Sequence, residues 1–387
     1  MSGIYFDHAA TSPMRPEALE AYVAAAGAGP GNPSSLHAFG RAARSRLTRA
    51  RDEIAGVLGC RPDELVFTGG GTESDNAALF GAARAMRARD GRRLGVVTTA
   101  VEHHAVLHAC RALASEGFEL TVLPVDETGR VSLEDARAAI GPTTAVVSVM
   151  AGNNEVGTLQ PYAEIGELAR AHGAVMHVDA VQAFGYEPID LSALPVDLLS
   201  VSAHKMGGPQ GVGALYVRTG TPWQPLLYGG SQERKRRAGT ENVAGIAAFA
   251  AAAKLAAAER EARRAHAETV RGALIRALTV ELGADAFALN GEQRPESRLP
   301  HIASIVFYDV PNETMLMSLD LAGVAASGGS ACTSGSLQPS HVLEAMGLAS
   351  HFCRQAVRFS FGLGNTTAEA EKTAKIIATI TTRLRNR

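Results

Sequence analysis

The sequence predicts an α/β protein with a mostly parallel sheet covered by helices and a second, smaller α/β unit. The first observation is that short apolar runs alternate with helical patterns between residues 65 and 217, and such alternation builds parallel sheets. The second is that polar residues follow several of these runs, at the strand ends where open α/β sheets bind ligands. The third is size, because 387 residues, 46% hydrophobic and 20% charged, can form a large core and two domains.

Composition and charge exclude several classes of protein. The net charge is −2 and no basic cluster is interleaved with aromatic residues, which argues against nucleic acid and acidic membranes as partners. No run of about 18 apolar residues predicts a membrane span. The chain opens on a strand pattern without signal-peptide features, and its cysteines show no CxxC spacing, so we expect a cytoplasmic protein with reduced thiols. These cysteines are Cys60, Cys110, Cys332 and Cys353.

The part of the chain before the sheet is expected to be largely helical. A short strand at residues 4–6 enters a turn, and a helix begins at about Pro16. Turn residues at 31–37 form a loop, and a long helix rich in arginine and alanine follows and ends at Leu58.

A glycine-rich turn follows the first strand of the predicted sheet. Strand 65–68 leads into residues 69–76, and a helix then continues to about Arg89. Free N–H groups at the start of this helix, its dipole and the Thr72 hydroxyl suit a bound phosphate. The alternative is a simple glycine turn with Thr72 as the helix N-cap. The Rossmann and P-loop motifs are not matched.

Further strands are expected at 95–99, 119–123, 145–150 and 174–179, each followed by a turn or a helix. Right-handed crossovers bring the carboxyl ends of such strands to one edge of the sheet. We therefore expect one crevice there, lined by Thr72, His103, Asn154, Asp179, Ser202, His204 and Lys205.

A lysine at the end of an apolar strand is the most informative single feature. The run at 198–202 ends in Ser202-Ala203-His204-Lys205 before glycines and a proline. Burying an unpaired ammonium costs several kcal/mol, and one solution is a Schiff base to an aldehyde cofactor, usually pyridoxal phosphate (PLP). Such a cofactor needs an acid beside its ring nitrogen, and Asp179 ends the preceding strand. The alternatives are a lysine that reaches solvent and an aspartate that caps a helix.

The C-terminal half predicts a connecting helix and a smaller unit. A basic, glycine-rich loop that ends at Thr240 suits a second contact to phosphate or substrate. One long alanine-rich helix is expected from about Asn242 to Leu278, bridging two domains, and strand 303–307 then opens the smaller unit. Arg358 lies on an apolar strand, where its partner is either a substrate carboxylate or a structural carboxylate.

Cys332 lies within a run of small residues at 324–336. Because no bulky side chain anchors this run, we expect a mobile segment with a reachable thiol, although small-residue packing is the alternative. The other three cysteines fall in helical or helix-end patterns and are interpreted as structural.

Together these motifs resemble the cysteine desulfurases of the NifS/IscS type, which are class V aminotransferase-family, fold-type I PLP enzymes. The matching motifs are Gly71–Asn76, Glu102-His103, Asn153–Gly157, His177–Ala180, Ser202–Lys205 and Gly329–Ser334. The resemblance covers nearly the whole chain, and the cysteine motif separates this family from other PLP transferases. It implies a seven-stranded large domain at residues 16–255, and a small domain from both chain ends, at residues 1–15 and 256–387. It also implies a homodimer with the active site at the subunit interface.

The resemblance implies a role for each matching residue. The residues that would contact PLP are Gly71, Thr72, His103, Asn154, Asp179, Gln182, Ser202, His204, Lys205 and Thr240. Lys205 would hold the cofactor as a Schiff base, Asp179 would pair with the ring nitrogen, and His103 would stack on the ring. Asn154 and Gln182 would bind the ring hydroxyl. The remaining residues would bind the phosphate, with Thr240 reaching in from the partner subunit.

The implied reaction converts L-cysteine to L-alanine. Arg358, together with Asn154, would hold the substrate carboxylate. The catalytic residues would be Lys205, His103 and Cys332, with Cys332 attacking the substrate sulfur and becoming a persulfide. The persulfide would supply a sulfur-acceptor protein, either an iron–sulfur scaffold or a thiolation enzyme. No permanent metal is implied, and Cys332 could ligate an iron–sulfur cluster transiently.

Three alternative functions use the same residues. A selenocysteine lyase or an aminotransferase would share the crevice, and Cys332 argues against the aminotransferase. A non-catalytic sulfur carrier could keep the fold, but intact Lys205, Asp179 and His103 argue against it. Close relatives often continue into a tail that docks an iron–sulfur scaffold, whereas this chain ends at Arg387, so scaffold docking is not implied.

Overall fold

The computed structural model describes residues 3–329 and 339–385, so Cys332 lies outside the described residues. Its largest element is a seven-stranded sheet with the order β2-β8-β7-β6-β5-β3-β4. Only β8 runs antiparallel to its neighbours; β7, β6, β5, β3 and β4 are parallel. The predicted mostly parallel sheet is confirmed. Its strands are β2 (Leu65–Thr68), β3 (Gly95–Thr99), β4 (Glu119–Leu123), β5 (Thr144–Met150), β6 (Val175–Asp179), β7 (Leu198–Ser202) and β8 (Gly213–Val217).

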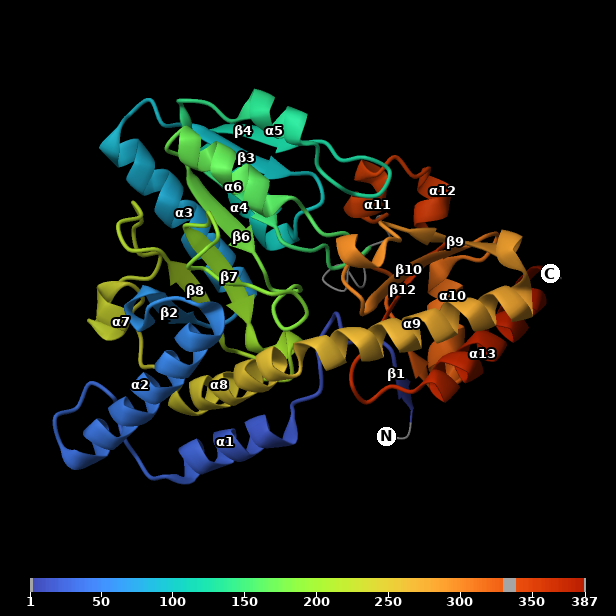
Figure 1. Ribbon diagram of the computed structural model, residues 1–387, viewed down its shortest axis with the longest axis horizontal. Helices are drawn as coiled ribbons and strands as arrows, with labels where there is room; N and C mark the ends of the chain where they lie inside the picture. Colours follow the sequence, from blue (N-terminus) through green and yellow to red (C-terminus); the bar gives the residue numbers. More distant parts are fainter. Residues whose placement is uncertain (1–2, 330–338, 386–387) are drawn as a thin grey trace.

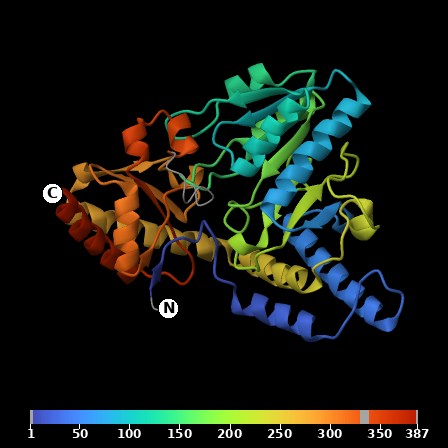
Figure 2. The same ribbon diagram turned by 180° about the vertical axis from the view of Figure 1, so that it is seen from behind.

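Helices cover both faces of this sheet, which explains why its strands are apolar at successive positions. Val66 packs with α3 and α4, whereas its neighbour Phe67 packs with α2, and Val96 and Val97 divide in the same way. Figure 1 shows α5 and α6 over one face, and Figure 2, from behind, shows α3 over the other. The helices of this unit are α1 (Pro16–Gly27), α2 (Ala38–Leu58), α3 (Gly71–Arg89), α4 (His104–Ser115), α5 (Leu133–Ala139), α6 (Tyr162–Ala171) and α7 (Gln232–Lys235).

A second, three-stranded antiparallel sheet has the order β12-β10-β9. The N-terminal strand β1 (Ile4–Tyr5) lies beside this sheet and pairs in parallel with β11 (Val324–Ala325), so the start of the chain joins its C-terminal part there (Figure 1). The division into domains at residues 15 and 255 stays a prediction. The remaining elements are β9 (Phe287–Asn290), β10 (Ile302–Phe307), β12 (Ala356–Ser360), α10 (Asn312–Leu321), α11 (His341–Ala345), α12 (Ser350–Cys353) and α13 (Thr367–Arg385).

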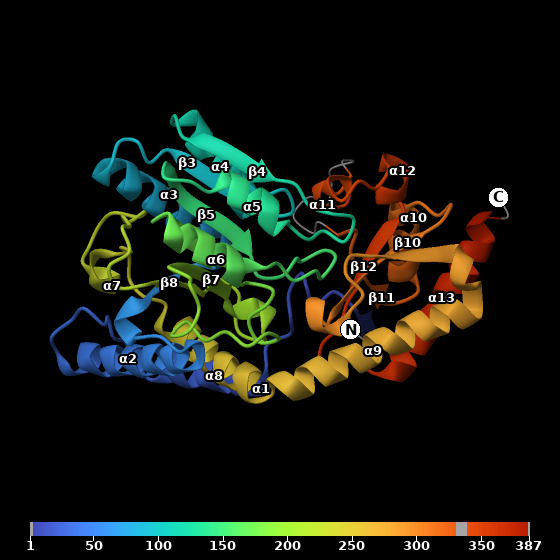
Figure 3. The same ribbon diagram turned by 45° about the horizontal axis from the view of Figure 1, so that its top comes forward.

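Two consecutive helices, α8 (Val243–Ala258) and α9 (Arg260–Leu282), connect the sheets (Figure 3). The prediction of one continuous helix was wrong, because the helix is interrupted at Glu259, with φ −96° and ψ 4°. No glycine or proline marks this position in the sequence. The Glu259 carboxylate accepts hydrogen bonds from Arg15 at 2.7 and 3.1 Å, so a contact distant in the chain accompanies the break. Across residues 3–329 and 339–385, none of the helices combines the length and apolar character needed to cross a bilayer.

Local contacts account for two residues of the basic run at 234–237, Arg236 and Arg237. Arg237 forms two hydrogen bonds to the Glu73 carboxylate, at 2.8 and 3.1 Å, and Arg236 donates to the carbonyl of Asp63. The preceding Glu233 is buried, pairs with Arg51, and accepts the N–H of Phe67 at 2.9 Å. Because β2 is an edge strand, Glu233 satisfies an N–H that would otherwise lie unpaired. The loop before Thr240 is therefore fixed to the sheet by a buried ion pair.

Glu233→Ala is expected to lower the free energy of unfolding by about 3–5 kcal/mol, because it leaves the buried Arg51 charge without its carboxylate. The measurement is denaturant unfolding at one protein concentration. The matched control is Glu167→Ala, which removes an exposed pair with Arg170 and should cost at most about 1 kcal/mol. Equal effects of the two substitutions would contradict the assigned role of Glu233.

Candidate active site

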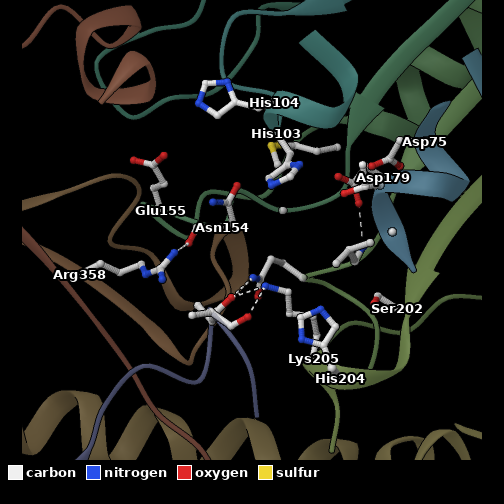
Figure 4. A pocket seen from close by; sticks show the side chains of 18 of the residues that line it. Asp75, His103, His104, Asn154, Glu155, Asp179, Ser202, His204, Lys205 and Arg358 are labelled. Atoms are coloured by element: carbon white, nitrogen blue, oxygen red, sulfur yellow. Dashed lines mark hydrogen bonds between the residues drawn. The ribbon is translucent and has the colours of Figure 1, made fainter. Parts of the chain in front are cut away.

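The carboxyl ends of β5, β6 and β7 border a cavity of about 210 Å³. Strand register explains the convergence, because Met150 pairs with Asp179 and Asp179 pairs with Ser200. Ten of the sequence-predicted residues line this cavity (Figure 4): Gly71, Thr72, His103, Asn154, Asp179, Gln182, Ser202, His204, Lys205 and Arg358. Thr240 is exposed between α7 and α8 and does not line the cavity. Cys332 lies outside the described residues.

Lys205 lies in the single helical turn that follows β7. Its Nζ donates to the carbonyls of Ala9 at 2.5 Å and Ala10 at 3.0 Å. Burial, together with the positive charge of Lys205, lowers the pKa of His204 to about 4. His103 has a pKa of about 4 for the same two leading reasons. Both imidazoles are therefore neutral at pH 7, and the lysine supplies positive charge on this side of the cavity.

Buried carboxyl groups lie on the side of the cavity away from Lys205. Burial raises the pKa of Asp179 to about 6, while a 2.9 Å hydrogen bond from the Val181 N–H and the charge of Lys205 act in the opposite direction. Burial and the nearby Asp179 raise the pKa of Asp75. Glu102, also buried, has a pKa raised to about 8. A cationic group beside Asp179 would relieve the cost of ionising this set.

The N-terminus of α3 borders the cavity beside Ser202 and His204. The N-cap is Gly70, which has no side chain to bond the first N–H groups, so the alternative of Thr72 as N-cap is wrong. Gly70 has φ +148°, and a Cβ on Gly71 would lie 2.8 Å from the Val181 side chain. Because these two residues have no side chains, a ligand can come close to the backbone and reach its N–H groups. The arrangement fits an anionic group such as a phosphate.

Arg358 lies on β12 of the smaller sheet and borders the opposite end of the cavity. Its guanidinium pairs with Asp7 at 3.0 Å and donates to the Asn154 carbonyl at 2.8 Å. The structural salt bridge that the sequence left open is therefore present, and Arg358 also faces the cavity. Its Nε is buried and has no hydrogen-bond partner among the described residues. Gln182, meanwhile, donates to the Ala9 carbonyl at 2.7 Å.

Sequence reasoning missed several cavity residues. Asp75 and Glu155 lie inside motifs that had been singled out, so their polarity was an available signal. Nothing in the sequence marks Ala9 and Ala10, whose carbonyls meet Lys205 only through the tertiary fold.

The cavity offers partners for a ligand that has a basic nitrogen, an anionic arm and a group that reacts with an amine. An amine, a buried carboxyl group and a set of N–H donors border the same space. Within the described part of the chain, no group of three histidine, cysteine or acidic side chains could hold a metal ion.

Known proteins resemble this chain along its whole length. Residues 4–372 match the family model described as Aminotransferase class-V. IscS 1 of Bacillus subtilis (strain 168) is 48% identical over 385 residues, covering 99% of this chain and 100% of that protein. Cysteine desulfurase IscS of Methanosarcina thermophila is 44% identical over 383 residues, covering 99% and 93%. The solved structure of a NifS-like protein has a TM-score of 0.91 and 35% identity, covering 98% of this chain and 100% of its own.

The raised pKa of Asp179 predicts a pH-dependent stability. Between pH 4 and about 6, native Asp179 binds more protons than the unfolded chain does, so the free energy of unfolding falls as pH rises through this window. Asp179→Asn removes this dependence and should be more stable than wild type at pH 7.5, by roughly 2–3 kcal/mol.

The two proteins, freed of any bound cofactor, are compared by denaturant unfolding at pH 4 and pH 7.5. Their difference should shrink toward zero at pH 4, since the aspartate is then protonated. A constant difference across the range would show that Asp179 ionises without cost.

Proposed function

Because this chain belongs to the class-V aminotransferase family and is a cysteine desulfurase of the IscS/NifS type, we propose that its cavity binds PLP and that Cys332 takes sulfur from L-cysteine. The observation that carries this proposal is that Lys205 and the buried Asp179 line the same cavity. The neighbouring N-terminus of α3 completes the set of contacts that this cofactor requires.

Each part of PLP has a candidate partner. Lys205 would bind its aldehyde carbon, Asp179 would face its ring nitrogen, and the α3 N-terminus would hold its phosphate. Thr72, Ser202 and His204 surround the phosphate position, and His103, Asn154 and Gln182 border the ring position. When bound, PLP supplies an electron-accepting ring that stabilises negative charge at the substrate carbon bearing the amino group.

His103 is oriented by the first turn of α4. Its Nδ1 accepts the Ala105 N–H at 3.1 Å, so the neutral ring carries its proton on Nε2. His103 can therefore donate a hydrogen bond through Nε2 and stack through its face. Lys205 Nζ is the amine that would move a proton at the substrate carbon.

Arg358 and the Asn154 side chain would hold the substrate carboxylate. The Arg358 side chain is only 2% exposed, and Asp7, with which it forms an ion pair, is 20% exposed. A second anion would further compensate a guanidinium that water does not reach.

The sulfur transfer is proposed to occur on Cys332. Its thiolate attacks the sulfur of L-cysteine, an S–S bond forms, and the C–S bond of the substrate breaks. The electron pair of that bond stays on carbon, which takes a proton to give L-alanine, and the enzyme keeps a persulfide. The persulfide then passes sulfur to an acceptor protein, an iron–sulfur scaffold or a thiolation enzyme.

The described cysteines are poor alternatives to Cys332. Burial and nearby carboxylates raise the pKa of Cys60 to about 12, and burial raises the pKa of Cys110 to about 12. Burial also raises the pKa of Cys353. Since the thiolate is the nucleophile, none of these three suits the attack at neutral pH. All three are free thiols, which fits the reducing cytoplasm as the proposed location.

A homodimer is proposed from apolar side chains at one end of the molecule. Leu36 is 84% exposed and Tyr228 is 80% exposed, and Leu19, Val23 and Phe39 are also exposed. Figure 1 shows α1, the start of α2 and the loop before α7 at the end remote from the smaller sheet. Exposed apolar groups gathered at one end indicate a protein interface. Thr240 lies on the loop that follows α7, which supports its proposed reach into the partner's cavity.

Product analysis tests the function directly. Wild type with PLP and L-cysteine should release L-alanine and carry one additional sulfur on Cys332, detected by alkylation and mass spectrometry. Cys332→Ser should keep PLP absorbance and cysteine binding but lose persulfide formation, with a rate at least roughly 100-fold lower. Lys205→Ala should lose activity and should not be labelled by borohydride reduction. Cys60→Ser is the matched control and should retain wild-type turnover. A wild-type rate in Cys332→Ser would refute the assigned nucleophile.

The dimer is tested by light scattering, which should give twice the chain mass of 40.4 kDa. Replacing Leu36 and Phe39 together with Asp should shift the protein toward the monomer, because buried charges oppose association. Leu321→Asp, at a residue 89% exposed on α10, is the matched control and should leave the dimer intact. A dimer that survives the first change would place the interface elsewhere.

A further inference from the structure

We propose that Glu155 is a positioning residue whose carboxylate holds both ends of the segment that carries Cys332, and so sets where the thiol meets the substrate. This inference rests on the proposed function of Cys332. It concerns the described residues on either side of the segment, Gly329 and Ser340, and the turn that bears Glu155.

The turn that carries Glu155 is itself firmly held. It follows β5, and the side chain of Asn153 accepts the N–H groups of Glu155 at 2.8 Å and Val156 at 2.9 Å. The Asn153 amide also donates to the Val101 carbonyl at 2.9 Å. Glu155 is 2% exposed and lines the cavity beside Asn154 and Arg358 (Figure 4). The carboxylate is thus a fixed point at the end of the cavity proposed for the substrate carboxylate.

The N-terminal end of the segment passes directly against this carboxylate. A Cβ added to Gly329 would lie 2.7 Å from Oε2 of Glu155, a separation that real Cβ atoms do not show. Gly329 also has φ +96°, in the region that favours glycine. Just before it, Ser327 exchanges two backbone hydrogen bonds with Arg358, at 2.7 and 3.1 Å. The chain before Cys332 is therefore attached to β12 through Ser327, and at Gly329 it passes so close to Glu155 that only glycine fits.

The C-terminal end meets the same oxygen. Ser340 Oγ donates to Glu155 Oε2 at 2.5 Å, and both groups are buried. Ser340 Oγ also caps α11 by accepting the Leu343 N–H at 3.3 Å. The next residue, His341, has its Nε2 2.9 Å from the carbonyl of Glu102. One carboxylate oxygen thus binds Ser340 after the segment and lies where a side chain on Gly329, just before the segment, would be.

Because the chain has a maximum length per residue, the position of Gly329 limits how far away Cys332 can lie. A residue three positions after Gly329 lies no more than about 11 Å from it, since an extended chain spans at most about 3.6 Å per residue. Gly329 lies against Glu155, and Glu155 borders the cavity beside Arg358. Holding Gly329 therefore keeps Cys332 within reach of a substrate bound by Arg358. Releasing it would enlarge the volume that the thiol explores and dilute its productive encounters.

The charge environment of Glu155 separates two roles. Arg358 and His104 act electrostatically on the carboxylate, and Ser340 acts through a hydrogen bond. If Glu155 works by attachment, an acceptor at the same place is sufficient. If it works by compensating Arg358, its negative charge is required. Glu155→Gln keeps the acceptor and removes the charge, so it distinguishes the two roles.

The test uses PLP-loaded enzyme and single-turnover persulfide formation on Cys332. Glu155→Ala and Ser340→Ala are each expected to slow this step by roughly 10–100-fold, because the thiol is misplaced. PLP absorbance and the spectrally measured affinity for L-cysteine should stay at wild-type values. Glu155→Gln should restore the rate to within about threefold of wild type. In the Glu155→Ala background, Ser340→Ala should have no further effect, because the two groups act through one contact.

Matched controls exclude simpler explanations. Ser132→Ala removes the N-cap of α5, where Ser132 Oγ accepts the Glu134 N–H at 3.1 Å, and should not alter the rate. Alkylation of Cys332 by a small reagent without substrate should remain at least as fast as in wild type, which shows that the thiol is intact.

The proposal is overturned if Glu155→Gln is as slow as Glu155→Ala, or if the slow variants have lost PLP or cysteine binding. It is also overturned if Ser340→Ala forms persulfide at the wild-type rate. Failure of the proposed function would look different, since wild type itself would then place no sulfur on Cys332.

Discussion

The compensation of buried charge around one cavity is the constraint on which the rest of this structure depends. Asp179 and Arg358 are buried and Lys205 is partly buried, and each needs partners that the fold must supply. Much of the compensation comes from the short N-terminal stretch at residues 7–10. Asp7 pairs with Arg358, and the carbonyls of Ala9 and Ala10 accept the Lys205 amine. The chain end that joins the smaller sheet therefore also completes the site on the larger one.

The sequence predicts the parts of this site that follow from local pattern. Strand ends in a parallel sheet share one edge, so Asn154 and Asp179 could be placed together from the alternation of apolar runs alone. The roles of Ala9 and Ala10 could not be predicted, because carbonyl groups are present at every residue and only the tertiary fold selects these two. The interruption at Glu259 could not be predicted for the same reason, since its contact is with Arg15, which is distant in the chain.

Burial of several carboxyl groups near Asp179 is costly for folding. Asp75 and Glu102 lie in the same interior, and burial raises the pKa of each, so ionising all of them together is opposed. Asp179 accepts the N–H of Val181 at 2.9 Å, and the charge of Lys205 favours its ionised form. The free energy lost by burying these carboxyl groups would be recovered in part by a ligand that brings a basic nitrogen beside Asp179.

The same stretch of chain limits the distance between the Lys205 amine and the Arg358 guanidinium. Asp7 and Ala9 are two residues apart, so their Cα atoms are separated by at most about 7 Å, whatever the packing of the two sheets. Asp7 holds Arg358 and Ala9 holds Lys205, which makes this separation a matter of backbone length. A ligand that contacts both cations would therefore have to match a separation that this short stretch of backbone limits. Glu155 applies the same logic on the opposite side, where Gly329 and Ser340 meet a single carboxylate oxygen. Short-range contacts of Asp7, Ala9 and Glu155 therefore attach Arg358, Lys205 and Ser340 around one cavity.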